Sequence, residues 1–176
     1  MLAASGLLAA CATLQTVVGL LNNQLILGPS QLQAQLDRRF PRAYEQGMAT
    51  LTLLNPRLSI PHGDNRLRLD MDIGFRGLGS DGSRPVGRFA VASGIRFDAR
   101  TRGLHLADPS LEAIEIPRLG GALNATGRDL VNRWLRDYAR DEPVYTLDDV
   151  YARLRPGQTV TATRIANGQV VVDFSD

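Results

Sequence analysis

Residues 66–76 read RLRLDMDIGFR, and this stretch decides the fold. Apolar side chains at 67, 69, 71, 73 and 75 alternate with arginine, aspartate and glycine. Alternation with a period of two over this length predicts a β-strand with one apolar and one solvent-facing side. Residues 88–97, RFAVASGIRF, repeat the pattern after a turn rich in glycine and serine, and 104–116 continue it. We therefore expect an antiparallel meander.

Two helices are expected on either side of this meander. The first opens at Pro29-Ser30, with Ser30 as the cap and Gln33 three residues on, and it ends at Pro41. The second covers 126–140, where the apolar positions form a single stripe at helical spacing.

Shorter extended segments complete the chain. We expect strands at 23–28, at 50–60 with an interruption near Pro56, and at 144–147, and a helical turn at 148–154. Two further strands, 159–164 and 169–174, are joined by the hairpin signal Asn167-Gly168. The order strand, helix, sheet, helix, sheet predicts an α+β domain over 23–176.

Composition argues against nucleic-acid binding. All 20 basic residues are arginines spread along the chain, 18 residues are acidic, and the formal net charge is +2. No basic patch is evident, and an aromatic content of 6% provides few surfaces for base stacking. No apolar run after residue 30 approaches the roughly 18 residues needed to cross a bilayer.

The N-terminus contains the chain's single cysteine. Residues 1–10 are apolar, uncharged and rich in small side chains, as in the apolar core of an export signal, but they lack the usual basic start. We interpret them as a truncated signal peptide. Leu8-Ala9-Ala10-Cys11 resembles the lipobox of bacterial lipoproteins, which implies cleavage before Cys11, lipid on its thiol and a tether over 11–22. Ala12, at the position after the cysteine, resembles lipoproteins sorted to the outer membrane, because retention in the inner membrane typically uses Asp there. The alternative is a buried free cysteine in an N-terminal helix.

No motif predicts catalysis, a cofactor or a metal. Residues 77–82 match GxGxxG but lead into another strand, whereas a dinucleotide fingerprint must open a helix. The two histidines, His62 near Asp64 and His105 between leucines, are too few for a zinc site. The carboxylate pairs at 112/115 and 148/149 are more simply charged surface than an acid/base pair.

The chain resembles the YceB-like family of proteobacterial lipoproteins, which has no assigned enzymatic activity. The resemblance rests on the lipobox, on Leu32, Leu36 and Phe40-Pro41, on the alternating strands, on 143–147 and on 170–174. It implies a relative of the tubular lipid-binding (TULIP) superfamily. In that fold a strongly curved antiparallel sheet wraps around a long helix and encloses an apolar groove.

The resemblance implies a lipid-anchored protein on the periplasmic face of the outer membrane that binds a lipid or acyl chain. The apolar residues that would form the groove, or equally a filled core, are Leu67, Leu69, Met71, Ile73, Phe75, Phe89, Val91, Ile95, Phe97, Leu130, Val131, Trp134, Leu135 and Tyr138. Patterning cannot separate a groove from a core, because both need the same alternation. The alternative function is an envelope lipoprotein that binds a protein or has a structural role, with a closed core and no ligand. Neither hypothesis implies a particular oligomeric state.

Overall fold

The structure is a computed structural model that describes residues 23–46, 49–77, 80–117 and 125–175. Two antiparallel sheets form most of it. The small sheet has the order β1-β10-β9, with β1 Gln24–Leu27, β9 Val160–Ala166 and β10 Gln169–Phe174. The large sheet has the order β2-β3-β4-β6-β7-β8, and β5 pairs with β4. Its strands are β2 Arg42–Gln46, β3 Ala49–Ser59, β4 Leu67–Gly77, β5 Ser80–Asp81, β6 Gly87–Asp98, β7 Gly103–Glu115 and β8 Tyr145–Thr146.

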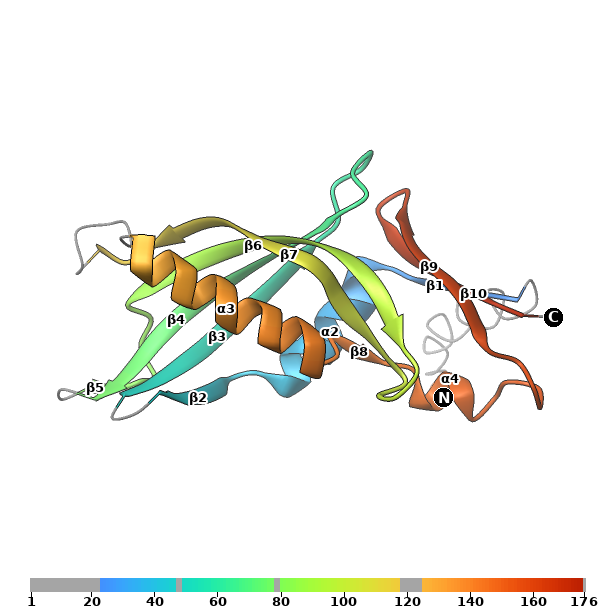
Figure 1. The fold of residues 1–176 in the computed structure, drawn as a ribbon, viewed down its shortest axis with the longest axis horizontal. Coiled ribbons are helices and arrows are strands. Elements are labelled where there is room, and N and C mark those ends of the chain that lie inside the picture. The colour runs from blue at the N-terminus through green and yellow to red at the C-terminus, as the bar shows by residue number, and fades with distance from the viewer. Residues whose placement is uncertain (1–22, 47–48, 78–79, 118–124, 176) are drawn as a thin grey trace, which may run out of the picture.

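Three helices accompany the sheets in the described part of the chain: α2 Pro29–Arg39, α3 Ala125–Asp141 and α4 Asp148–Tyr151. In Figure 1, α3 crosses one face of the large sheet, and the small sheet lies at one end of the molecule near α4. The contacts of α3 with the large sheet are mainly with β7. The α+β class expected from the sequence is confirmed.

The alternation in β4 has the predicted consequence. Leu67, Leu69 and Met71 are at most 1% exposed, whereas Arg68 and Asp70 form an ion pair on the opposite face. The strand lies between β3 and β6 in an antiparallel register that pairs Leu69 with Leu58 on one side and with Val91 on the other. Its apolar side therefore contributes to the centre of the core.

The interruption expected near Pro56 is a bulge in β3. The register with β4 shifts between Leu54 and Arg57, and Asn55 has a φ of 48°. Proline has no N–H to donate to the ladder, so the strand tolerates it only at such an irregularity. The side chain of Gln33 on α2 supports the bulge, because its amide donates to the Pro56 carbonyl (2.7 Å) and accepts from the Leu58 N–H (2.8 Å).

The hairpin signal at Asn167-Gly168 is also confirmed. Both residues have positive φ, 53° and 74°, as a tight two-residue turn between β9 and β10 requires.

The cap of α2 differs from the prediction by two residues. Gly28, not Ser30, is the cap, and its N–H donates to the side chain of Gln31 at 2.8 Å. Pro29 is already suited to the first helical position because its φ is fixed, so the cap lies immediately before it. With the cap at Gly28, the side chain that completes the capping box is Gln31, and the side chain of Gln33 bonds to β3 instead.

Two further features were not predicted. The sequence pattern predicted neither β2 nor the short β5, and the strands form two sheets where the resemblance implied one curved sheet. All the same, one continuous hydrophobic core includes Leu25 and Val172 of the small sheet together with Met71 and Leu106 of the large one.

Candidate functional site

The predicted groove residues lie in this core. Those on the two central strands of the large sheet are between 0% and 9% exposed: Leu67, Leu69, Met71, Ile73, Phe89, Val91 and Ile95. On α3, Leu135 is 1% and Tyr138 4% exposed, and Val131 and Trp134 pack against the core while partly buried. The side chains of Phe75 and Leu130 lie outside the described part of the structure, as do Cys11 and the segments 1–10 and 11–22.

Trp134 connects α3 to two strands that are not neighbours. Its ring lies 5.3 Å from that of Tyr44 on β2 and 6.2 Å from that of Phe89 on β6, both in edge-on geometry. The ring of Tyr138 lies 5.5 Å away on the next turn of α3. Since β3 and β4 separate β2 from β6 in the sheet order, one indole spans this part of the sheet face.

Not all predicted groove residues face α3. Phe97 stacks against Tyr151 of α4, at a centroid distance of 6.1 Å, and Ile95 borders a hollow formed with Ile165 of β9. The register of β6 with β7 is irregular between Ala92 and Gly94, just before these two residues. Past this bulge, the side of β6 that carries Ile95 and Phe97 turns toward the small sheet and α4.

The C-terminal half of α3 is fixed by polar contacts. The carbonyl of Ala139 accepts from Arg96 Nη2 and from His105 Nδ1, each at 3.1 Å. The other ring nitrogen of His105 lies 2.7 Å from the Thr101 hydroxyl, and the residue is 0% exposed. Burial lowers the pKa of His105, which favours the neutral ring, and because the Ala139 carbonyl can only accept, Nδ1 carries the proton.

A second group of polar residues lies where α3 ends beside β2. Glu142 forms a bidentate ion pair with Arg42, with N···O distances of 2.6 and 3.2 Å, and Arg39 donates a hydrogen bond to the Pro143 carbonyl. In contrast, no side-chain hydrogen bond joins residues 128–134 of α3 to either sheet within the described part of the chain. Among the described residues, the polar contacts of α3 with its surroundings thus lie at its C-terminal end, while Val131 and Trp134 pack against the core.

Two phenols lie next to this ion pair. The Tyr44 hydroxyl is buried without a hydrogen-bond partner, and burial raises its pKa. Burial also raises the pKa of Tyr138. For both phenols, the charge of Arg42 lowers the pKa and the charge of Glu142 raises it, by less than burial does. Tyr44 was not predicted from the sequence, because it is the only large apolar side chain in the short strand β2 and no periodicity marks it.

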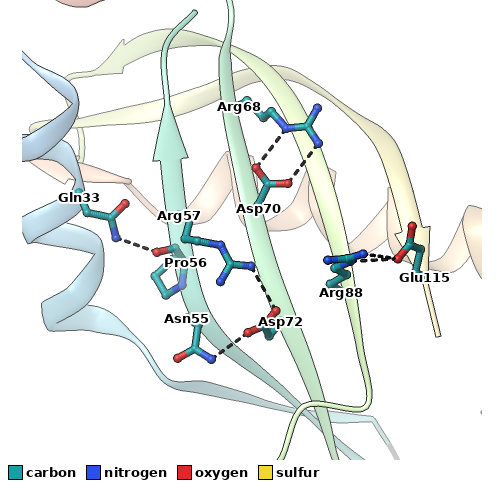
Figure 2. Close-up of polar contacts among 9 residues, drawn as sticks. All are labelled: Gln33, Asn55, Pro56, Arg57, Arg68, Asp70, Asp72, Arg88 and Glu115. Atoms are coloured by element: carbon teal, nitrogen blue, oxygen red, sulfur yellow. Dashed lines mark hydrogen bonds and ion pairs between the residues drawn. The ribbon is translucent and has the colours of Figure 1, made fainter. Parts of the chain in front are cut away.

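The outer face of the large sheet carries balanced charge. Figure 2 shows Arg68 paired with Asp70, Arg57 with Asp72, and Arg88 with Glu115. These arginines border a hollow of about 610 Å³ that also reaches Ala90 and Ala113. Each arginine drawn has a carboxylate partner, so the Arg/Asp alternation read from the sequence forms a solvated, nearly neutral surface.

The other residues considered for chemistry are separated in space. Glu112 pairs with Arg68 and Glu115 with Arg88, so the two carboxylates do not act together. His62 is exposed in a turn. Among the described residues, no group of three or more histidine, cysteine or acidic side chains is placed to hold a metal ion. Nor does any helix in that part have the length and apolarity to span a membrane.

Fold and site together define an α+β protein with an aromatic contact region between α3 and the large sheet. No family model matches the chain, and no curated protein matches it. The similarity to the YceB-like family stays a prediction from the sequence.

Proposed function

We propose that the chain is a lipoprotein anchored through Cys11 to the periplasmic face of the outer membrane, and that its domain binds a lipid or other apolar ligand between α3 and the large sheet. The large sheet would then curve around α3 as in the tubular lipid-binding fold. The proposed role is binding, without cofactor, metal or catalysis.

The ligand proposal rests on one observation: different kinds of contact hold the two parts of α3. Its C-terminal half is fixed through Ala139 and, one residue past its end, through Glu142, whereas the contacts of Val131 and Trp134 with other described residues are apolar. Apolar contacts are non-directional, and their free energy scales with the buried area at roughly 25 cal/mol per Å². An acyl chain that replaced the contacts of Val131 and Trp134 would recover much of that free energy, so this half of α3 can move aside at low cost.

Native mass spectrometry of the full 176-residue chain tests the ligand proposal. We expect adducts of acyl-chain mass that exchange with added lipid. Val131→Asp, which places a carboxylate in the apolar stripe, should abolish them, whereas Arg133→Asp on the exposed side of α3 should keep them. Repeated recovery of folded protein without bound or exchangeable lipid would contradict the proposal.

The anchor is tested separately. Expression of the chain behind a complete bacterial signal sequence should give a product labelled by radioactive palmitate and recovered with membranes. Cys11→Ser should lose both the label and the membrane association. An unmodified Cys11 in the mature protein would rule the anchor out.

A second function is favoured by the packing. The predicted groove residues are buried in a single core, and the hollow near the C-terminal half of α3, about 410 Å³, is lined by charged Arg96, Arg136 and Arg140. This arrangement suits an envelope lipoprotein with a closed core that acts through its surface. Folded protein that never takes up lipid, wild type and variants alike, would favour this second function.

A further inference from the structure

The contact between β2 and α3, here named the β2–α3 seam, comprises Arg42, Tyr44, Trp134, Tyr138 and Glu142. It is closed by side chains alone, through the Arg42–Glu142 ion pair and the Tyr44–Trp134 ring contact. Because β2 is the edge strand of the large sheet, the seam lies at an open edge of that sheet.

The seam contains a hydrogen-bond donor without a partner among the described residues. The Tyr44 hydroxyl is one of three buried side-chain polar atoms without a partner in the described part of the chain. The ring of Tyr138, a residue that is 4% exposed, lies 5.5 Å from that of Trp134, so a second phenol borders the same contact. Native proteins pair nearly all buried polar groups, so an unpaired hydroxyl at this position suits a partner from outside the chain.

The charge near these phenols favours an anion. Arg39 and Arg42 bring two guanidinium groups to the seam, against the single carboxylate of Glu142. The bidentate contact with Glu142 uses two of the five N–H donors of Arg42, so its guanidinium can bond to a second acceptor. Two phenolic O–H groups beside a guanidinium form a site for a group that accepts several hydrogen bonds and carries negative charge.

We propose that the β2–α3 seam binds the anionic head group of a single-chain amphiphile. Tyr44 and Tyr138 donate to that head group, Arg42 faces it, and the acyl chain passes Trp134 toward Phe89. This inference rests on the proposed function and adds to it the chemical class of the ligand and the place of its polar end. A carboxylate and a phosphate share this chemistry, so a fatty acid and a lyso-phospholipid are the two possible sources.

Trp134 provides the measurement, because it is the only tryptophan of the chain and lies in the seam. Its fluorescence is titrated in the full chain with dodecanoate, dodecyl phosphate and 1-dodecanol, each below the concentration at which it forms micelles. We expect both anions to bind at least tenfold more tightly than the alcohol, because a hydrogen bond to a charged group is stronger than one to a neutral group. The tighter of the two anions identifies the source.

Three variants locate the head group. Tyr44→Phe keeps the ring and should weaken binding of both anions about tenfold, while binding of 1-dodecanol changes less than twofold. Tyr151→Phe, which removes a phenol from the stack with Phe97 at α4, should leave all three affinities unchanged. Glu142→Gln removes the competing carboxylate and should tighten anion binding several-fold, whereas a purely structural ion pair would give no such gain.

The stability of the ligand-free protein gives an independent readout. Tyr44→Phe should not lower the urea midpoint, because it removes an unpaired hydroxyl and no hydrogen bond. A clear loss of stability would mean that the hydroxyl has a structural partner, and would overturn the assignment.

The remaining outcomes separate the two proposals. If none of the three amphiphiles binds, the proposed function fails and the seam assignment fails with it. If all three bind equally tightly, or if Tyr44→Phe affects them equally, apolar binding stands and the head-group site is wrong.

Discussion

Gln33 shows how a single side chain joins two elements. Its amide bonds to both the Pro56 carbonyl and the Leu58 N–H, across the bulge that proline forces on β3 (Figure 2 shows the first of these bonds). We expect Gln33→Ala to lower the free energy of unfolding by about 1–2 kcal/mol, because both backbone groups lose a partner. Gln35→Ala, two residues on, should change it by less than about 0.5 kcal/mol. Urea denaturation measures both, and equal effects would rule out the bridging role.

His105 makes the stability depend on pH. Burial holds its pKa below the ordinary 6.5, so as the pH falls the unfolded chain takes up this proton before the folded one does. The contribution of the neutral ring is therefore complete above about pH 6.5 and decreases as the pH drops through that value toward the folded-state pKa. Urea midpoints between pH 8 and pH 5 should fall less steeply for His105→Gln than for wild type, while exposed His62→Gln should follow wild type. Parallel curves for His105→Gln would contradict this.

At the scale of elements, the close packing of the turn after β4 depends on a glycine. A Cβ at Gly74 would overlap the Gly82 carbonyl oxygen, whereas one at Gly94 in β6 would meet only ordinary contacts near 3.4 Å with Ala107. We expect Gly74→Ala to destabilise the protein by about 2 kcal/mol and Gly94→Ala by less than half as much. Thermal unfolding of both variants is the measurement. Equal losses would show that the overlap is relieved by a small shift of the turn.

The elements that the sequence predicted are those with local signals. Alternation over 67–75 identified β4, and Asn167-Gly168 identified the hairpin of β9 and β10. β2 escaped prediction because its stability comes from pairing with β3 and from the contact of Tyr44 with Trp134, and both partners are distant in sequence. The cap of α2 was placed at Ser30 because serine is a common capping residue, but Pro29 already occupies the first helical position, so Gly28 is the cap.

At the scale of the whole molecule, the two sheets share one core. The apolar residues of the core were predicted from period and composition, but their division between α3 and the small sheet was not. That division follows from the irregular register near Gly94, which turns Phe97 toward Tyr151, and no pattern in the sequence marks it. The seam was also beyond prediction, because its residues come from strand and helix segments about 90 residues apart.

A shared core predicts cooperative unfolding. Trp134 reports on the contact of α3 with the large sheet, and far-UV circular dichroism reports on both sheets. In urea the two signals should change in a single coincident transition, as expected for one domain. Two separate transitions would show that the small sheet or α3 unfolds independently.

The pairing of β1 with β10 constrains the order of folding. Gln24 bonds to Asp173, 149 positions further along the chain, and β10 is the central strand of its sheet. During synthesis, Leu25 and Leu27 therefore have no strand to pair with until nearly the whole domain has left the ribosome. This sheet therefore stays unformed until the last strand of the domain has been made, and factors that hold nascent polypeptides unfolded would have a correspondingly long time to act on it.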